Sequence, residues 1–175
     1  INIQRQKEQT LEIEDIINDW VKSLIEQRMS FFFFYAKDQT RGGQSSSGEN
    51  VGEKDLEVFN AQNDKLFLFE AFRLLSVNTN VIEEHINKLD GYNADGCHTL
   101  IIMAYTHVND FVALCNNYQE ILKTFDYKGF DKLTSLEEHS FDILDTKSSK
   151  IKFLKEVRYQ NNEAVVVYHF LLDFK

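Results

Sequence analysis

Two short stretches, GEKDLEVF (residues 52–59) and LFLFEAFR (residues 66–73), decide the fold expected for this chain. The second is rich in apolar residues, the first ends in Leu56, Val58 and Phe59, and a short polar segment separates them, so they predict two strands joined by a tight turn. A turn centred between Gln62 and Asn63 would place Asp55 directly opposite Glu70 in an antiparallel pair. Like charges that face each other destabilise a sheet, so this pair predicts a divalent cation with oxygen ligands between the two carboxylates.

This arrangement resembles the core of the PD-(D/E)XK nuclease superfamily. In that family an acid on one strand and a Glu/Asp-x-Lys on the next strand bind Mg²⁺ and activate water against a phosphodiester. The resemblance implies that Asp55 and Glu70 are the metal ligands. The family's lysine, two residues after Glu70, is replaced by Phe72. Lys54 and Arg73 are the nearest cationic candidates, although both alternate to the opposite face of an ideal strand.

The resemblance therefore implies a domain that engages DNA or another nucleic acid with Mg²⁺ as its cofactor, with hydrolysis weakened or lost at Phe72. The competing interpretation is a protein-interaction or adaptor module built on an inactivated nuclease fold, within a larger bacterial protein. A purely structural domain is a third reading. A nuclease requires a basic surface beside Asp55 and Glu70, whereas an adaptor requires an exposed apolar patch.

Composition limits these possibilities. The 175 residues fit one domain, and 43% of them are hydrophobic, which is enough for a full core. The formal net charge of −9 argues against nonspecific coating of nucleic acid, but it leaves room for a local basic cleft. Two cysteines are too few for a disulfide scaffold, so we expect a cytoplasmic protein. No apolar run is long enough to span a membrane, and the first residue, Ile1, suggests a fragment of a longer chain.

Periodicity predicts the remaining elements and an α/β fold, a restriction-endonuclease-like mixed sheet flanked by helices with an added C-terminal β-hairpin. We assign residues 1–150 to the PD-(D/E)XK-like core and residues 151–175 to a hairpin packed on the same domain. The expected helices are residues 4–28, 81–89 and 110–125, with Thr79 or Asn80 as the N-cap of the second. The further strands expected are residues 31–35, 98–106, 151–159 and 164–174.

The four consecutive phenylalanines at 31–34 predict a strand buried on both faces. The apolar stripe of the first helix, which includes Ile16 and Trp20, is expected to cover that strand. Three acids on the same helix, Glu12, Glu14 and Asp15, could add a metal ligand. A solvated helix face is the simpler interpretation of these residues.

Two further features leave alternatives open. The loop RGGQSSSG (residues 41–48) could wrap a phosphate backbone or be simply flexible. The five histidines show no metal-ligand spacing, and His85 is expected to reach solvent from its helix. Cys115 is expected in the core.

Overall fold

The computed structural model describes residues 16–17, 19–37, 56–93, 96–127, 129–130, 135–139 and 150–175. The chain divides into two compact units, unit 1 (Ile1–Leu66) and unit 2 (Phe67–Lys175). We describe each unit by itself.

Unit 1 corrects the prediction for the phenylalanine run. Residues 19–29 are helical, as expected, but they continue into a short 3₁₀ helix, η1 (Ser30–Phe32), instead of a strand. Phe33 then adopts a left-handed conformation with φ of 61°, and its N–H donates to the Ser30 carbonyl at 3.0 Å. A left-handed residue is a common way to end a helix, so the run forms a helix terminus. The strand prediction was wrong because this local hydrogen bonding outweighed the β propensity of phenylalanine.

The predicted burial of the first helix was also wrong. Ile16 is 64% exposed and Trp20 is 60% exposed, and the rings of Phe31, Phe32 and Phe33 are exposed as well. Since the phenylalanine run does not form a strand, it offers no sheet face for the helix to cover. Strand β1 (Tyr35–Lys37) begins only after the run, and it pairs antiparallel with β2 (Leu56–Phe59).

A tight turn follows β2, as predicted, but its centre differs. The Asn60 N–H donates to the Asp64 carbonyl and the Asn63 N–H donates to the Asn60 carbonyl, both at 3.0 Å. Asn63 has φ of 68°, which is the conformation of a bulge residue in a three-residue hairpin loop. Asn60 therefore pairs with Asp64, and the turn is centred on Gln62.

This shift matters for the candidate site. Side chains alternate along a strand, so a register change of one residue moves a side chain to the opposite face. The expected opposition of Asp55 and Glu70 depended on a turn centred between Gln62 and Asn63. Asp55 lies outside the described residues, so the pairing stays a prediction.

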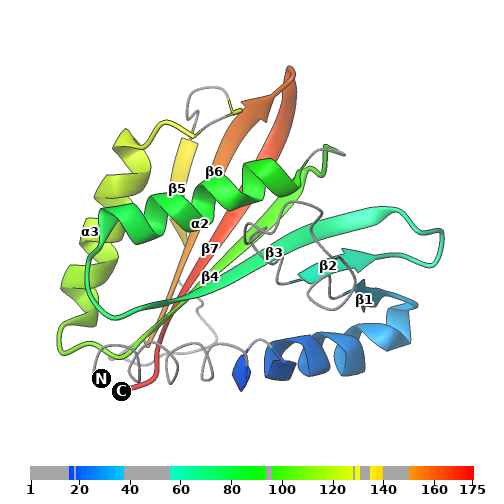
Figure 1. Cartoon of the computed structure of the whole chain (residues 1–175), viewed down its shortest axis with the longest axis horizontal. Helices are drawn as coiled ribbons and strands as arrows, with labels where there is room; N and C mark the ends of the chain where they lie inside the picture. Colours follow the sequence, from blue (N-terminus) through cyan, green and yellow to red (C-terminus); the bar gives the residue numbers. More distant parts are fainter. Residues whose placement is uncertain are drawn as a thin grey trace, which may run out of the picture. The chain divides into compact units, whose positions relative to one another are not determined.

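Unit 2 is a mixed α/β sheet in the strand order β3-β4-β7-β6-β5 (Figure 1). Strand β4 is parallel to both β3 and β7, as its continuous apolar sequence suggested, whereas β6 is antiparallel to β7 and to β5. The bounds are β3 (Lys65–Leu74), which begins in unit 1, α2 (Thr79–Tyr92), β4 (Thr99–Thr106), α3 (Phe111–Thr124), β5 (Ser135–His139), β6 (Ile151–Gln160) and β7 (Glu163–Asp173).

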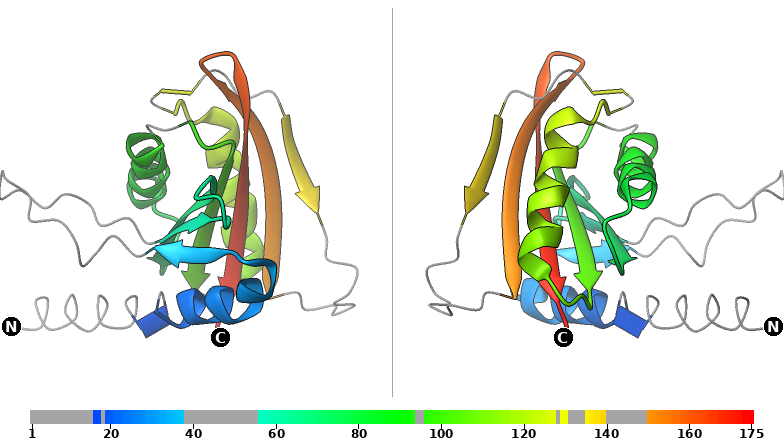
Figure 2. Two further views of the ribbon diagram at one scale, coloured as in Figure 1. Left: turned by 90° about the vertical axis from the view of Figure 1, so that its right-hand side faces the viewer. Right: turned by 90° about the vertical axis from the view of Figure 1, so that its left-hand side faces the viewer.

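Helices α2 and α3 pack on one face of this sheet and close the main core, and α3 runs along β4 and β7 (Figure 2). The predicted inward residues of α2 and the predicted core position of Cys115 on α3 are confirmed. The N-cap of α2 is Asn78, whose side-chain oxygen accepts from the Val81 N–H at 3.3 Å, and not Thr79 or Asn80. The buried residues of the two helices are Ile82, Ile86, Leu89, Leu114, Cys115, Tyr118 and Leu122.

The C-terminal hairpin is confirmed, and it lies inside the sheet of unit 2. Asn161 and Asn162 connect its strands with φ of 53° and 68°, the conformation of a two-residue hairpin turn. Because β7 pairs along its length with β4, the hairpin completes the core that α2 and α3 cover.

Candidate functional site

Glu70 is the predicted site residue that the structure describes most fully. It lies in the middle of β3, in register with Ile102 of β4, and its side chain faces α2. It is only 1% exposed. Its Oε1 lies 2.7 Å from His85 Nδ1 and 3.6 Å from Lys88 Nζ, both on α2. Its Oε2 is buried and has no hydrogen-bond partner among the described residues.

Burial controls the protonation of this carboxyl. The loss of hydration raises the pKa of Glu70 from 4.5 to about 8, and the charge and hydrogen bond of Lys88 only partly oppose this shift. Glu84 adds a smaller repulsion in the same direction as burial. Glu70 is therefore largely protonated at neutral pH.

Phe72 lies two residues after Glu70 on β3, and its ring stacks on His85. The two ring centroids are 4.4 Å apart and the planes differ by 9°. This contact packs Phe72 into the core and fixes the plane of the imidazole beside Glu70. His85, which was expected to reach solvent, is partly buried, with 15% of its side chain exposed.

Sequence reasoning missed the contribution of His85 and Lys88. A signal was present, because His85 lies three positions after the apolar residue Ile82, and Lys88 lies three positions after His85, so the three share one side of α2. The sequence did not show that this side would meet Glu70, because that depends on how α2 crosses the sheet.

The other predicted site residues are not brought to Glu70 by the described structure. Asp55 and Lys54 lie outside the described residues. Arg73 is in register with Tyr105 and alternates to the face opposite Glu70, as the strand period predicted.

The described residues do not by themselves fit a Mg²⁺ site. Magnesium is held by carboxylate and water oxygens, whereas the Oε1 atom of Glu70 contacts two nitrogen groups, His85 Nδ1 and Lys88 Nζ. In the part of the chain that the structure describes, no group of three or more His, Cys, Asp or Glu side chains is placed to hold a metal ion.

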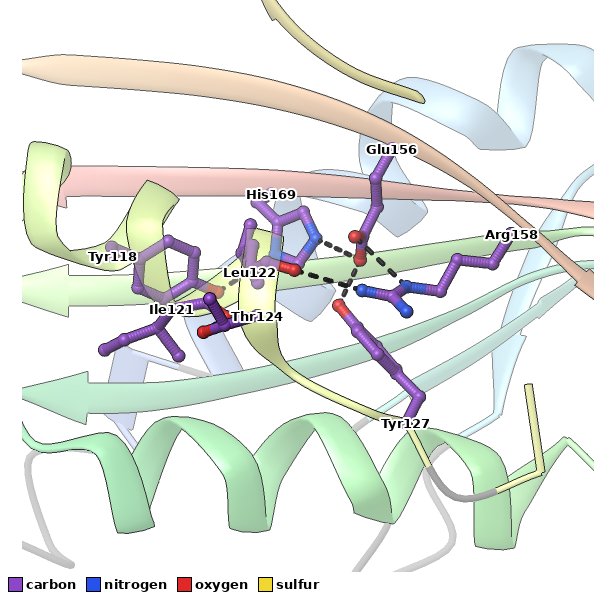
Figure 3. A network of polar contacts seen from close by, with 8 residues as sticks. All are labelled: Tyr118, Ile121, Leu122, Thr124, Tyr127, Glu156, Arg158 and His169. Carbon is purple, nitrogen blue, oxygen red and sulfur yellow. Dashed lines mark hydrogen bonds and ion pairs between the residues drawn. The ribbon is translucent and has the colours of Figure 1, made fainter. Parts of the chain in front are cut away.

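A second polar cluster lies in the core of unit 2, and sequence reasoning did not identify it (Figure 3). His169 of β7 contacts Tyr118 of α3 through Nδ1 and Glu156 of β6 through Nε2, both at 2.9 Å. Glu156 also accepts from Arg158 Nε at 3.2 Å and from the Tyr127 hydroxyl. All five side chains are buried.

Burial opposes ionisation of Glu156, but the hydrogen bond and charge of His169, the charge of Arg158 and the hydrogen bond of Tyr127 outweigh it and lower the pKa of Glu156. Burial and the Glu156 charge raise the pKa of Tyr118 and of Tyr127 well above 10, so both remain hydrogen-bond donors. The cluster is a polar network buried in the core of unit 2.

Comparisons with family models, with curated proteins and with solved structures find no match to this chain. None of the helices in the described segments has the length and apolar character needed to cross a bilayer.

Proposed function

We propose that this chain is a protein-interaction module on a PD-(D/E)XK-like α/β scaffold whose hydrolytic site is disarmed. The observation that carries the proposal is the packing of β3 on α2. Glu70 is buried and protonated at neutral pH, and Phe72 fills the lysine position by stacking on His85. Glu70 and Phe72, at the acid and lysine positions of the motif, therefore pack in the core and do not face a substrate.

Exposed apolar residues on unit 1 support the interaction role. Ile16, Trp20 and Leu24 recur every four residues along the helix and are all exposed, and the rings of the phenylalanine run follow. Such spacing presents one apolar helix face, which is the recognition mode of helices that bind in hydrophobic grooves. We therefore propose a protein partner with an apolar groove.

Affinity enrichment from the source cells tests this role. The natural chain is compared with Trp20→Ser and with a matched control, Val112→Ser, which changes a 68% exposed residue of α3. A specific partner should be retained by the natural chain and by the control and lost from Trp20→Ser. Equal retention by all three chains would exclude this helix face as the binding surface.

A metal-dependent nuclease is the second candidate, and one observation favours it. The ammonium group of Lys88 lies 3.6 Å from the Glu70 carboxyl, so α2 supplies the cation that Phe72 removed from the strand. Lys88 thus replaces Lys54 and Arg73 as the residue proposed to stand in for the family's lysine. Asp55 and Glu70 remain the proposed metal ligands, with DNA or another nucleic acid as substrate.

Cleavage assays with Mg²⁺ or Mn²⁺ separate the two candidates. We expect no cleavage by the natural chain, because the loss of one preorganised electrostatic stabiliser typically lowers a rate by about 10²–10³. Cleavage that disappears in both Glu70→Ala and Lys88→Ala would establish the nuclease. Cleavage gained only in Phe72→Lys would indicate an intact but disarmed site.

A further inference from the structure

The face of the sheet in unit 2 that lies opposite α2 and α3 carries aromatic side chains. Burial alternates along β6 and β7: within residues 154–158 and 165–171 every second residue is buried, and the residues between them are half-buried. The buried set faces the two helices (Figure 2). Phe153 of β6 and Tyr168 and Phe170 of β7 belong to the other, half-buried set. These three rings therefore lie outside the core that the helices close.

The three rings form one surface, which we call the aromatic platform. Phe153 is in register with Phe170, and their ring centroids are 4.9 Å apart. The ring centroids of Phe153 and Tyr168 are 5.6 Å apart, and the two planes differ by only 12°. The half-buried side chains of Ile101 and Met103, in register with Tyr168 and Phe170, continue the apolar surface onto β4. Ring planes that are nearly parallel and partly accessible suit the stacking of a flat ligand.

Positive charge gathers beside this platform, although the chain as a whole is acidic. The formal net charge is −9, yet three lysines occur within six residues at the beginning of β6, namely Lys150, Lys152 and Lys155. Lys155 alternates to the face of the platform and is in register with Tyr168. Glu137 of β5 is in register with Lys155 on its other side, so its formal charge offsets part of the positive charge. The basic surface is therefore small and local.

A nucleotide chain combines the two properties that this surface suits, flat bases and a negatively charged backbone. Proteins that bind single strands stack bases on aromatic side chains, in some cases those of a sheet face, and contact the phosphates with cations. A duplex hides the faces of its bases, so it cannot stack them on such a surface. An apolar protein surface fits less well, because it would have to remove the ammonium group of Lys155 from water.

We propose that the aromatic platform binds single-stranded nucleic acid, with bases stacked on Tyr168 and Phe170 and backbone phosphates beside Lys155. This role goes beyond the interaction proposed for unit 1, since it uses a different surface and needs neither Glu70 nor a metal ion. The few cations limit the contact to about two or three phosphates, so the slope of log affinity against log salt should be about −1.4 to −2.1.

Fluorescence anisotropy of labelled oligonucleotides, titrated with the natural chain, tests this proposal. We expect oligouridine, oligothymidine or both to bind, and duplex DNA of the same length not to bind. The comparison of the two single strands distinguishes RNA from DNA as the ligand. Tyr168→Leu and Phe170→Leu keep an apolar side chain but remove a stacking ring, so each should lower the affinity about tenfold. Lys155→Met should make the salt slope less steep by about 0.7.

The matched controls are Val112→Ser and Lys123→Met, which change an exposed apolar residue and an exposed cation of α3, on the other side of the sheet. Both variants, and Trp20→Ser, should bind oligonucleotides as the natural chain does, so failure of the partner proposed for unit 1 would leave this result unchanged. Circular dichroism verifies that every variant is folded.

The proposal is overturned if neither single strand binds, if duplex DNA binds as tightly as they do, or if both leucine variants bind as the natural chain does. If no oligonucleotide binds and Tyr168→Leu instead loses a protein that the natural chain retains from cells, the platform is a protein interface.

Discussion

The protonation of one carboxyl on β3, that of Glu70, determines the charge of the candidate site at neutral pH. Glu70 has no hydration, one close contact with His85 and a more distant ammonium group at Lys88. The unfolded chain would ionise this group near pH 4.5, whereas the folded chain holds the proton to about pH 8. The carboxyl therefore acts as a neutral core group over most of the physiological range.

The free energy of unfolding should consequently depend on pH through Glu70. Between about pH 4.5 and about pH 8 the folded state binds the extra proton, so stability is highest at the acid end and falls as the pH rises. The full difference is on the order of 5 kcal/mol before the structure relaxes. Glu70→Gln mimics the protonated group and should flatten this part of the profile.

Urea unfolding at several pH values between 5 and 9 measures this effect. The matched control is Glu120→Gln, an exposed carboxyl on α3, which should keep the profile of the natural chain. If Glu70→Gln and the natural chain keep a constant difference in stability across this range, Glu70 does not titrate there.

Trp20 is the second residue whose environment can be tested directly. It is the chain's single tryptophan and is 60% exposed, so its fluorescence should be quenched strongly by acrylamide. Trp20→Ser should change the free energy of unfolding by less than about 0.5 kcal/mol, because exposed positions contribute little. A loss of about 3 kcal/mol or more would show instead that the indole is buried.

At the scale of elements, periodicity predicted the buried helices and strands well. The apolar stripes of α2 and α3 are typical of helices that bury one face, and the continuous apolar run of β4 is typical of a buried strand. These elements were therefore recognisable from sequence. The run Phe31–Phe34 was not, because hydrogen bonds of the preceding helix turn, and not burial, decide its conformation. The centre of the turn after β2 was misplaced for a similar reason, since the Asn63 bulge depends on Asn60 side-chain bonds that periodicity does not report.

The hairpin turn between β6 and β7 gives a test at this scale. Asn162 has φ of 68°, a region that glycine adopts freely and alanine adopts only with strain. We expect Asn162→Ala to lower stability by about 1 kcal/mol and Asn162→Gly to leave it unchanged or slightly raised. Denaturant unfolding of both variants decides the point; equal losses would indicate that the Asn side chain matters more than its backbone conformation.

At the scale of the whole molecule, the sequence predicted the α/β class, the flanking helices and the terminal hairpin. It could not reveal which contacts join distant segments. Glu70 meets His85 only because α2 returns across β3, and Glu156 meets Tyr118 and His169 only because β6, β7 and α3 converge. Such polar contacts leave no periodic pattern in the sequence. The sequence therefore predicted Glu70 of β3 as a site residue but did not predict its partners on α2, His85 and Lys88.

The position of the hairpin leads to a prediction for the folding of unit 2. A chain that ends at Lys150 would lack β7, which pairs with β4, and with it the buried side chains of Val165, Val167 and Leu171. We expect this truncated chain to lose cooperative unfolding, because α2 and α3 would face an incomplete core. Circular dichroism and urea unfolding provide the measurement.

A chain shortened only by Lys175 is the matched control for that truncation. It keeps the whole of β7 and the bond from the Phe174 N–H to the Thr106 carbonyl, and it should unfold as the natural chain does. Cooperative unfolding of the chain that ends at Lys150, with α2 and α3 still protected from hydrogen exchange, would mean that the hairpin is an appendage. The strand order predicts the opposite, because β7 and β6 lie between β4 and β5, and their removal leaves an edge of each of these two strands unpaired.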